Sequence, residues 1–218
     1  MKNAFKILVI CDPQLKDDVE RIVGQQSSRL QTVYWQRGRS KKEIEPILNA
    51  PKEWDLLFSV YSDYIVPNHV LNKVSIPLNV HPALPNYPGV GYDVYPLIYD
   101  DDYCGATLHW MEEKCDYGVV LDTLPLPLPK GSTYPKVRKL NQQAVITLFE
   151  KWFRIATNDS RHTLYEQLHA PLQRQRGWDG NYSSLPDRRE KLNAFKSLNP
   201  IQWESLQIPD SVFFKCKP

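Results

Sequence analysis

The chain has 218 residues, which is enough for one sizeable hydrophobic core and a small appendage. Hydrophobic residues make up 42% of the sequence and charged residues 24%, a composition typical of soluble globular proteins that argues against wholesale disorder. The formal net charge of +2 creates no strong field of either sign. Composition therefore gives no support to nucleic-acid or membrane binding by bulk charge.

The first apolar run, residues 7–11, ends at Asp12 and Pro13. It is too short for a signal-peptide core or a membrane span, so we expect no membrane attachment. The cysteines are scattered and form no C-x-x-C pair, which indicates neither a zinc site nor a disulfide framework. They are Cys11, Cys104, Cys115 and Cys216. We expect a cytoplasmic protein with reduced thiols.

Short apolar runs then alternate with helix-compatible stretches over the first two thirds of the chain. The run at 5–11 does not alternate with polar residues, as expected of a strand that is covered on both faces. A helix is expected over 15–26, because apolar residues recur at helical spacing and Gly24 lies near its end. Further strands are expected at 30–36, 54–60, 76–81, 105–111 and 117–124, and further helices at 40–50, 67–74 and near 92–100.

Strands separated by helices indicate βαβ crossovers, a mostly parallel sheet and helices on both faces. The predicted fold class is therefore α/β, a doubly wound, Rossmann-like arrangement. In such sheets ligands bind beyond the carboxyl ends of the strands, which favours the loops that follow residues 60 and 81.

The sequence changes character near residue 125, where alternating prolines suit an edge or exposed extended segment. Apolar residues at three-to-four spacing then predict a long helix, with Pro135 tolerated in its first turn. We expect an α/β core over 1–130, a long helix over 131–158 that packs on it, and a polar, irregular C-terminal arm over 159–218.

Two well-known kinds of site are not supported by the motifs. The run "GVGYDV" (89–94) lacks the third glycine of a dinucleotide fingerprint, and no glycine-rich phosphate loop follows the first strand. The scattered histidines His109, His162 and His169 suit structural roles, so no metal site is expected.

The arm carries a cluster of basic side chains, for which a solvated surface is a commoner role than phosphate binding. They are Arg174, Arg176, Arg188, Arg189 and Lys191. Trp178 and Tyr182 lie between these cations, and they could either stack on a base or anchor the arm to the body.

Asn79 and His81 lie at the end of the strand 76–81, where a proline- and glycine-rich loop begins. If the strands 76–81 and 106–111 run parallel and close together, their carboxyl ends bring Asp116 near His81. An alternative remains open, in which Asp116 closes a turn by binding its own backbone.

The run from Asn79 to Pro85, then Gly89, then "GATLHWMEEKCDYGVVL" with Asp116 and Gly118 resembles the signature of the formyltransferases that use N10-formyltetrahydrofolate. The resemblance covers residues 54–125 well and residues 5–50 only in strand order. It implies a catalytic trio of Asn79, His81 and Asp116, with N10-formyltetrahydrofolate as the formyl donor.

The resemblance also implies where the ligands bind. The folate pocket would be lined by Tyr61, Ser62, Asp63, Tyr64, Ile65, Met111, Glu112, Lys114 and Cys115. Candidates for the acceptor side are Tyr87, Gly89 and Tyr92. Because no covalent enzyme intermediate is needed, Cys115 is expected to take no part in the chemistry.

The implied chemistry suits these residue types. An amine attacks the formyl carbon, and protonated His81 and the Asn79 amide would stabilise the resulting oxyanion. Asp116 would hold the imidazole and relay the amine proton.

A short arm and the missing phosphate loop most resemble the sugar N-formyltransferases, which act on a nucleotide-linked deoxyamino sugar. This implies a precursor of surface polysaccharide such as the lipopolysaccharide O-antigen, and a homodimer. Other small amines, such as glycinamide ribonucleotide, remain alternatives. So do hydrolysis of the same folate, which the start of the chain at its first strand argues against, and a non-catalytic folate- or nucleotide-binding module.

Overall fold

The computed structural model describes residues 5–25, 27–49, 54–158 and 161–214. Cys216 and residue 50, the last of the helix expected over 40–50, lie outside the described residues. None of the described helices has the length and apolar character needed to cross a membrane.

A six-stranded sheet forms the centre of the molecule, with the strand order β2-β1-β3-β4-β5-β6. Its strands are β1 (Ile7–Cys11), β2 (Leu30–Tyr34), β3 (Leu56–Val60), β4 (Ile76–His81), β5 (Tyr103–Trp110) and β6 (Val120–Pro127). Strands β1 to β4 are parallel, whereas β5 is antiparallel to both of its neighbours. The mostly parallel, doubly wound α/β fold is confirmed, but the parallel pairing of 76–81 with 106–111 is wrong.

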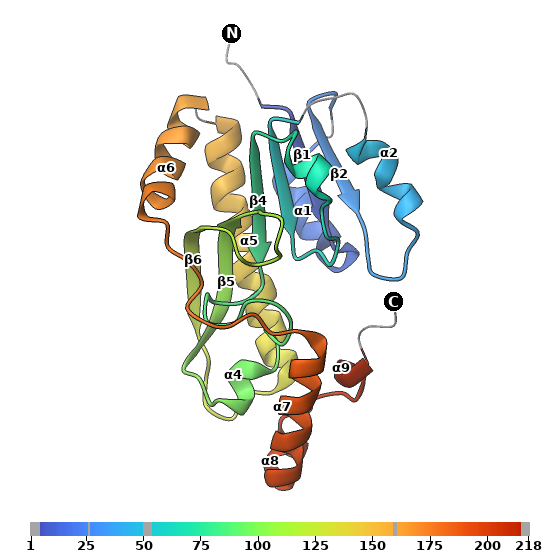
Figure 1. Ribbon diagram of the computed structural model, residues 1–218, viewed down its shortest axis with the longest axis vertical. Helices are drawn as coiled ribbons and strands as arrows, with labels where there is room; N and C mark the ends of the chain where they lie inside the picture. Colours follow the sequence, from blue (N-terminus) through green and yellow to red (C-terminus); the bar gives the residue numbers. More distant parts are fainter. Residues whose placement is uncertain (1–4, 26, 50–53, 159–160, 215–218) are drawn as a thin grey trace.

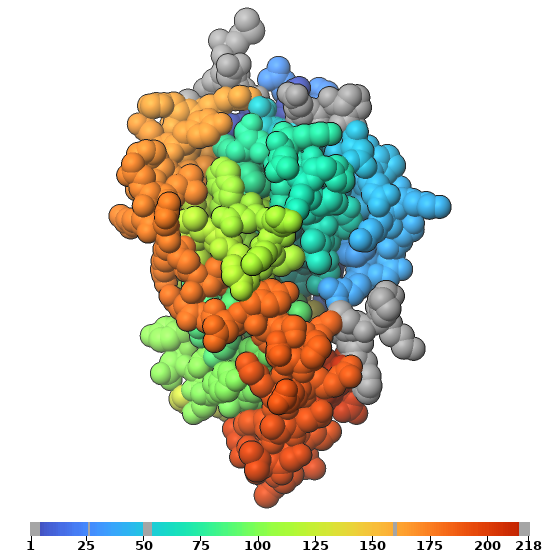
Figure 2. Space-filling model, in the orientation of Figure 1, coloured from blue at the N-terminus to red at the C-terminus, as the bar shows by residue number. Residues whose placement is uncertain are grey.

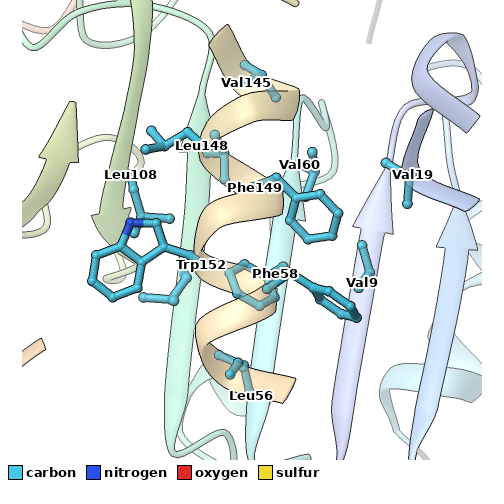
Figure 3. Packing of buried hydrophobic residues seen from close by; sticks show 14 of the residues in the cluster. Val9, Val19, Leu56, Phe58, Val60, Leu108, Val145, Leu148, Phe149 and Trp152 are labelled. Carbon is cyan, nitrogen blue, oxygen red and sulfur yellow. The ribbon is translucent and has the colours of Figure 1, made fainter. Parts of the chain in front are cut away.

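The helices cover the two faces of the sheet unequally (Figure 1). On one face lie α1 (Lys16–Val23) and the long helix α5 (Tyr134–Asn158), whose apolar stripe packs on β3, β4 and, most extensively, β5. Figure 3 shows this layer, in which the rings of Phe58 and Phe149 meet edge to face with centroids 5.3 Å apart. All five residues of β1 and of β3 are buried, as the non-alternating pattern of the first run predicts.

The other face carries the short helices α2 (Glu45–Leu48) and α3 (Asn68–Leu71), which pack on Leu8, Ile10 and Leu57. These helices cover only the β1–β3 side. Next to β4 and β5 this face carries the loop after β5 and a crossing segment, residues 175–184, instead of a helix (Figure 1). Leu78, Val80 and Leu108 point to α5 on the opposite face. Because side chains alternate along a strand, the polar residues between them point to this face.

Several helices are shorter than the sequence predicts. Helix α1 follows the 3₁₀ turn η1 (Pro13–Leu15) and ends at Gly24, where φ is +70°. The region 40–50 contains the 3₁₀ turn η2 (Lys41–Glu43) before α2, and Ser40 Oγ accepts from the Lys42 backbone. Helix α4 spans only Tyr95–Ile98.

The region beyond residue 158 is mostly helical, so the expectation of an irregular arm is wrong. It contains α6 (Arg161–Arg174), α7 (Leu185–Leu198), α8 (Pro200–Ser205) and α9 (Ser211–Phe214). A capping box between Ser184 and Asp187 starts α7. Buried Leu192 and Trp203 join a hydrophobic cluster with α4 and the start of α5. The division of the chain into core, helix and arm stays a prediction.

Candidate active site

Asn79 and His109 form a directly opposed pair on the antiparallel strands β4 and β5. Directly opposed residues present their side chains on the same face of a sheet. Asn79 Nδ2 accordingly lies 2.9 Å from His109 Nε2. His81, two residues after Asn79, shares this face, because side-chain direction in a strand repeats every second residue.

Asp116 reaches this face through the loop after β5, which folds back along the sheet. Asp116 adopts a φ of +51°, a left-handed conformation that aspartate tolerates. At Gly118 the chain passes so close to β5 that a Cβ atom would lie 1.8 Å from the Trp110 carbonyl oxygen. A glycine is therefore required where the loop returns to the strand.

The returning loop places the Asp116 carboxylate between two imidazoles. Its Oδ2 lies 3.4 Å from His81 Nδ1, and its Oδ1 lies 3.3 Å from His109 Nε2. Oδ2 also accepts a 2.8 Å hydrogen bond from the Gly89 backbone. The carboxylate thus binds other segments of the chain rather than its own turn, and the expected proximity of Asp116 to His81 arises from loop return and not from parallel strands.

His81 is 5% exposed, and its Nε2 lies 3.0 Å from the Tyr87 carbonyl oxygen. A carbonyl only accepts, so this contact places a proton on Nε2 and leaves Nδ1 facing Asp116. Burial lowers the pKa of His81, although the negative charge of Asp116 opposes this effect. The free enzyme therefore holds a neutral His81 at neutral pH, in contrast to the protonated His81 that the resemblance implies.

Asp116 is ionised. Burial acts to raise its pKa, but His81, His109 and the Gly89 N–H together hold the pKa of Asp116 at about 2. The site thus contains one carboxylate that is charged over the whole neutral range, with an imidazole against each of its oxygens.

His109 is part of this cluster, although the sequence reasoning assigns it a structural role. It is 2% exposed, and its Nδ1 donates to the Trp110 carbonyl oxygen at 2.9 Å. That bond leaves Nε2 to face Asn79 and Asp116. The antiparallel register could have revealed this role, because it sets His109 opposite Asn79, but the sequence carries no signal of strand direction.

A pocket opens beside the cluster and is lined by all three predicted catalytic residues and by all nine residues predicted to contact folate. Gly89 and Tyr92 also line it. Tyr87 does not belong to the lining; its ring stacks on Tyr99, its hydroxyl donates to Asp101 at 2.6 Å, and only its carbonyl serves the cluster. The resemblance implies that the segments 59–67 and 111–116 line the pocket, and Arg37 and Tyr182 are lining residues outside both segments.

The described residues contain no group of three or more His, Cys, Asp or Glu side chains that could hold a metal ion. Cys115 lines the pocket, but burial and the nearby Asp116 raise the pKa of its thiol. The thiol therefore stays protonated, which makes it a poor nucleophile.

The sequence matches no protein-family model, and no curated protein is detectably similar to it. The structure is similar to a 4-N formyltransferase from Francisella tularensis (22% identity over 85% of this chain and 78% of the other, TM-score 0.61) and to a sugar N-formyltransferase from a Shewanella species (21%, 84% and 78%, TM-score 0.61). The chain has the formyltransferase fold. A third example of this fold is the formyltransferase PseJ from Anoxybacillus kamchatkensis, with 18% identity over 95% of this chain and 97% of that chain and a TM-score of 0.60. PseJ was crystallised in complex with UDP-4,6-dideoxy-4-formamido-L-AltNAc and tetrahydrofolate.

Within this formyltransferase fold, the Asp116 cluster lies at the end of β4, on the part of its face that α2 and α3 do not cover. Figure 2 shows the same face, with the yellow-green loop after β5 bordered by the orange crossing segment. The candidate active site is therefore formed by strand ends, one returning loop and the crossing segment.

Proposed function

We propose that the protein transfers the formyl group of N10-formyltetrahydrofolate to the amino group of a nucleotide-linked deoxyamino sugar. The observation that carries this proposal is the Asp116 carboxylate between His81 and His109, at one end of a pocket in a formyltransferase fold. The acceptor class is supported by the sugar N-formyltransferases of similar structure and by the nucleotide sugar bound to PseJ.

The pocket suits the proposed formyl donor. Tyr64, Ile65 and Met111 supply flat and flexible apolar surface for a fused heterocycle, and Asp63 and Glu112 supply carboxylates that accept from its N–H groups. Tetrahydrofolate in PseJ supports the same choice.

Asn79 is the proposed oxyanion donor. Attack by the acceptor amine forms the new C–N bond and moves the carbonyl electron pair onto oxygen. The Asn79 amide has two N–H groups, and the His109 contact orients it while engaging one of them. The second N–H is then available to stabilise the developing oxyanion, a type of contact typically worth about 3–4 kcal/mol of activation free energy.

His81 is the proposed base. Its neutral form carries a lone pair on Nδ1, so it can accept the proton that the attacking amine must lose. Asp116 Oδ2 then stabilises the imidazolium that forms. When the tetrahedral carbon collapses, the carbonyl re-forms, the bond to N10 breaks and N10 takes the proton, so that tetrahydrofolate leaves.

We further propose a cytoplasmic homodimer that supplies precursors of a surface polysaccharide such as lipopolysaccharide O-antigen. The homodimer and the polysaccharide precursor rest on the resemblance to the sugar N-formyltransferases, and the cytoplasmic location rests on the scattered cysteines and the short first apolar run. All three stay predictions.

The proposal is tested by incubating the purified protein with N10-formyltetrahydrofolate and a panel of nucleotide-linked amino sugars. Release of tetrahydrofolate with a matching formylated sugar, detected by mass spectrometry, is the expected result. His81→Ala and Asp116→Ala should abolish turnover, whereas the exposed His169 on α6 offers a matched control in His169→Ala. Full turnover in both active-site variants would overturn the assignment.

The same assay separates the alternatives. Formate release without any added amine would assign a folate hydrolase instead. Turnover with glycinamide ribonucleotide alone would change the acceptor class. Folate binding by calorimetry without turnover on any acceptor would assign a binding module.

A further inference from the structure

One side chain of the crossing segment, Trp178, contacts His81, His109 and the loop that carries Asp116. The Trp178 ring centroid lies 5.3 Å from that of His81 and 5.0 Å from that of His109, with near-perpendicular planes in both pairs. Its Nε1 donates a 3.1 Å hydrogen bond to the carbonyl of Gly118, in the loop that carries Asp116. Trp178 therefore joins β4, β5 and the returning loop.

The backbone on both sides of Trp178 is held against the core. Before it, the Arg176 carbonyl accepts from the Val120 backbone at 2.7 Å. After it, the Asp179 N–H donates to the Pro85 carbonyl at 3.0 Å, and Gly180 passes so close to residue 86 that a Cβ atom would lie 2.0 Å from its carbonyl oxygen.

The far end of the crossing segment is tied to the loop before α4. The Val90 N–H donates to the Ser183 carbonyl at 2.9 Å, and the Ser183 N–H donates to the Pro88 carbonyl at 3.0 Å. A Cβ atom at Gly89 would lie 2.3 Å from the same Ser183 oxygen, so this approach requires glycine. Because Gly89 also donates to Asp116, the crossing segment and the catalytic carboxylate share one anchoring residue.

We propose that Trp178 is a positioning residue that holds His81, His109 and the Asp116 loop in their catalytic arrangement and shields the imidazoles from water. The proposal rests on the proposed formyl transfer for its kinetic consequences, but its geometric content concerns the free protein. The crossing segment would thus hold the active-site side chains in place as well as anchor the C-terminal helices.

The shielding by Trp178 should lower the pKa of His81. His81 faces the Asp116 carboxylate from the returning loop, the His109 imidazole from β5 and the Tyr92 ring from the loop before α4, with Trp178 as the uncharged wall. Burial is the main reason why the pKa of His81 lies below its usual value. Removal of the indole admits water, which should raise this pKa.

The test is an NMR titration of the histidine ring nitrogens in the full chain, in wild type, Trp178→Ala and Trp178→Phe. Trp203→Phe is the matched control, because Trp203 is buried in the distant cluster around α8. We expect a higher His81 pKa in Trp178→Ala, a smaller rise in Trp178→Phe, which keeps a ring but loses the Gly118 bond, and no change in Trp203→Phe.

The kinetic part of the test measures kcat/KM for formyl transfer against pH. In Trp178→Ala the acid limb should move to higher pH and kcat should fall about tenfold to hundredfold, as expected when reacting groups lose their alignment. An unaltered His81 titration in a folded Trp178→Ala would overturn the proposal. If Trp178→Ala does not fold, an unaltered His81 titration in Trp178→Phe would overturn the proposal instead. The titrations need no acceptor, so a failure of the proposed function does not affect them.

Discussion

Asp116 Oδ2 lies 3.4 Å from His81 Nδ1, although His81 ends β4 and Asp116 follows β5, a strand that runs antiparallel to β4. The contact depends on a loop that returns over the face of β5, and this return depends in turn on Gly118. The close approach of the backbone at Gly118 thus places the carboxylate of the His81–Asp116 pair.

The pH dependence follows from this pair. Because burial lowers the pKa of His81, kcat/KM should be constant at neutral pH and fall only at pH values below the ordinary histidine value of 6.5, where His81 becomes protonated. In Asp116→Asn the carboxylate that favours the imidazolium is lost, so the acid limb should move to still lower pH while kcat falls. Kinetic pH profiles of the two proteins check this. A shift to higher pH would contradict the assigned role of Asp116, and it is the opposite of the shift expected for Trp178→Ala.

His109 should contribute through the orientation of Asn79. His109→Phe keeps a flat ring but removes the nitrogen that accepts from the Asn79 amide. We expect kcat to fall about tenfold to hundredfold with little change in the KM for the folate. His169→Phe, at an exposed position of α6, is the matched control. Equal kcat values for the two variants would restore the purely structural role that the sequence suggests for His109.

Gly118 offers a test of the loop return itself. Neither Gly118 nor Gly177 has a left-handed backbone, so the two differ mainly in the space around them. An added Cβ at Gly118 would meet the Trp110 carbonyl at 1.8 Å, whereas at Gly177 it meets nothing within 4 Å. Gly118→Ala should cost about 1–3 kcal/mol of unfolding free energy and lower kcat by displacing Asp116. Gly177→Ala should stay within about 0.5 kcal/mol of wild type. Urea denaturation of both variants measures the difference, and equal stabilities would show that the loop does not need the close approach.

Acid stability provides a further check on Asp116. The pKa of Asp116 in the folded protein is about 2, below the ordinary aspartate value of 3.8. Its contribution to stability is therefore present above pH 3.8 and is lost as the pH falls toward 2. In Asp116→Asn this loss should be absent. Free energies of unfolding at neutral pH and near pH 3 for both proteins measure it. An identical pH dependence in the two proteins would mean that the carboxylate gains nothing from its two imidazoles.

The sequence predicts a mostly parallel sheet because its strands and helices follow local patterns, whereas the residues expected to line the pocket follow from the resemblance to the formyltransferases. The apolar run Ile7–Cys11 forms β1, and Leu56–Val60, which is apolar except for Ser59, forms β3. Pro125 and Pro127, in the stretch expected to be an edge or exposed segment, belong to β6 at the edge of the sheet. The direction of β5 was not predictable in the same way. β5 is buried over most of its length, as parallel strands usually are, so its apolar pattern does not reveal its direction. The short α4 also gives little indication of a crossover.

The parts of the site that the sequence reasoning missed are contacts between distant segments. His109 joins the cluster through cross-strand register, and Trp178 joins it from the arm, far along the chain. The arm itself looked irregular because its helices are short or strongly charged. In α7, for example, Leu192 is the buried apolar residue, and Arg188 is buried through a hydrogen bond to the Val212 carbonyl.

The central claim is that one carboxylate between two imidazoles enables formyl transfer. Its most direct test is the rate of tetrahydrofolate release, at saturating N10-formyltetrahydrofolate and an accepted amino sugar, for wild type, Asp116→Asn and the exposed control Asp210→Asn. We predict a fall in kcat of about 10²- to 10⁴-fold for Asp116→Asn and an unchanged kcat for Asp210→Asn. A folded Asp116→Asn protein with the wild-type kcat would contradict the claim.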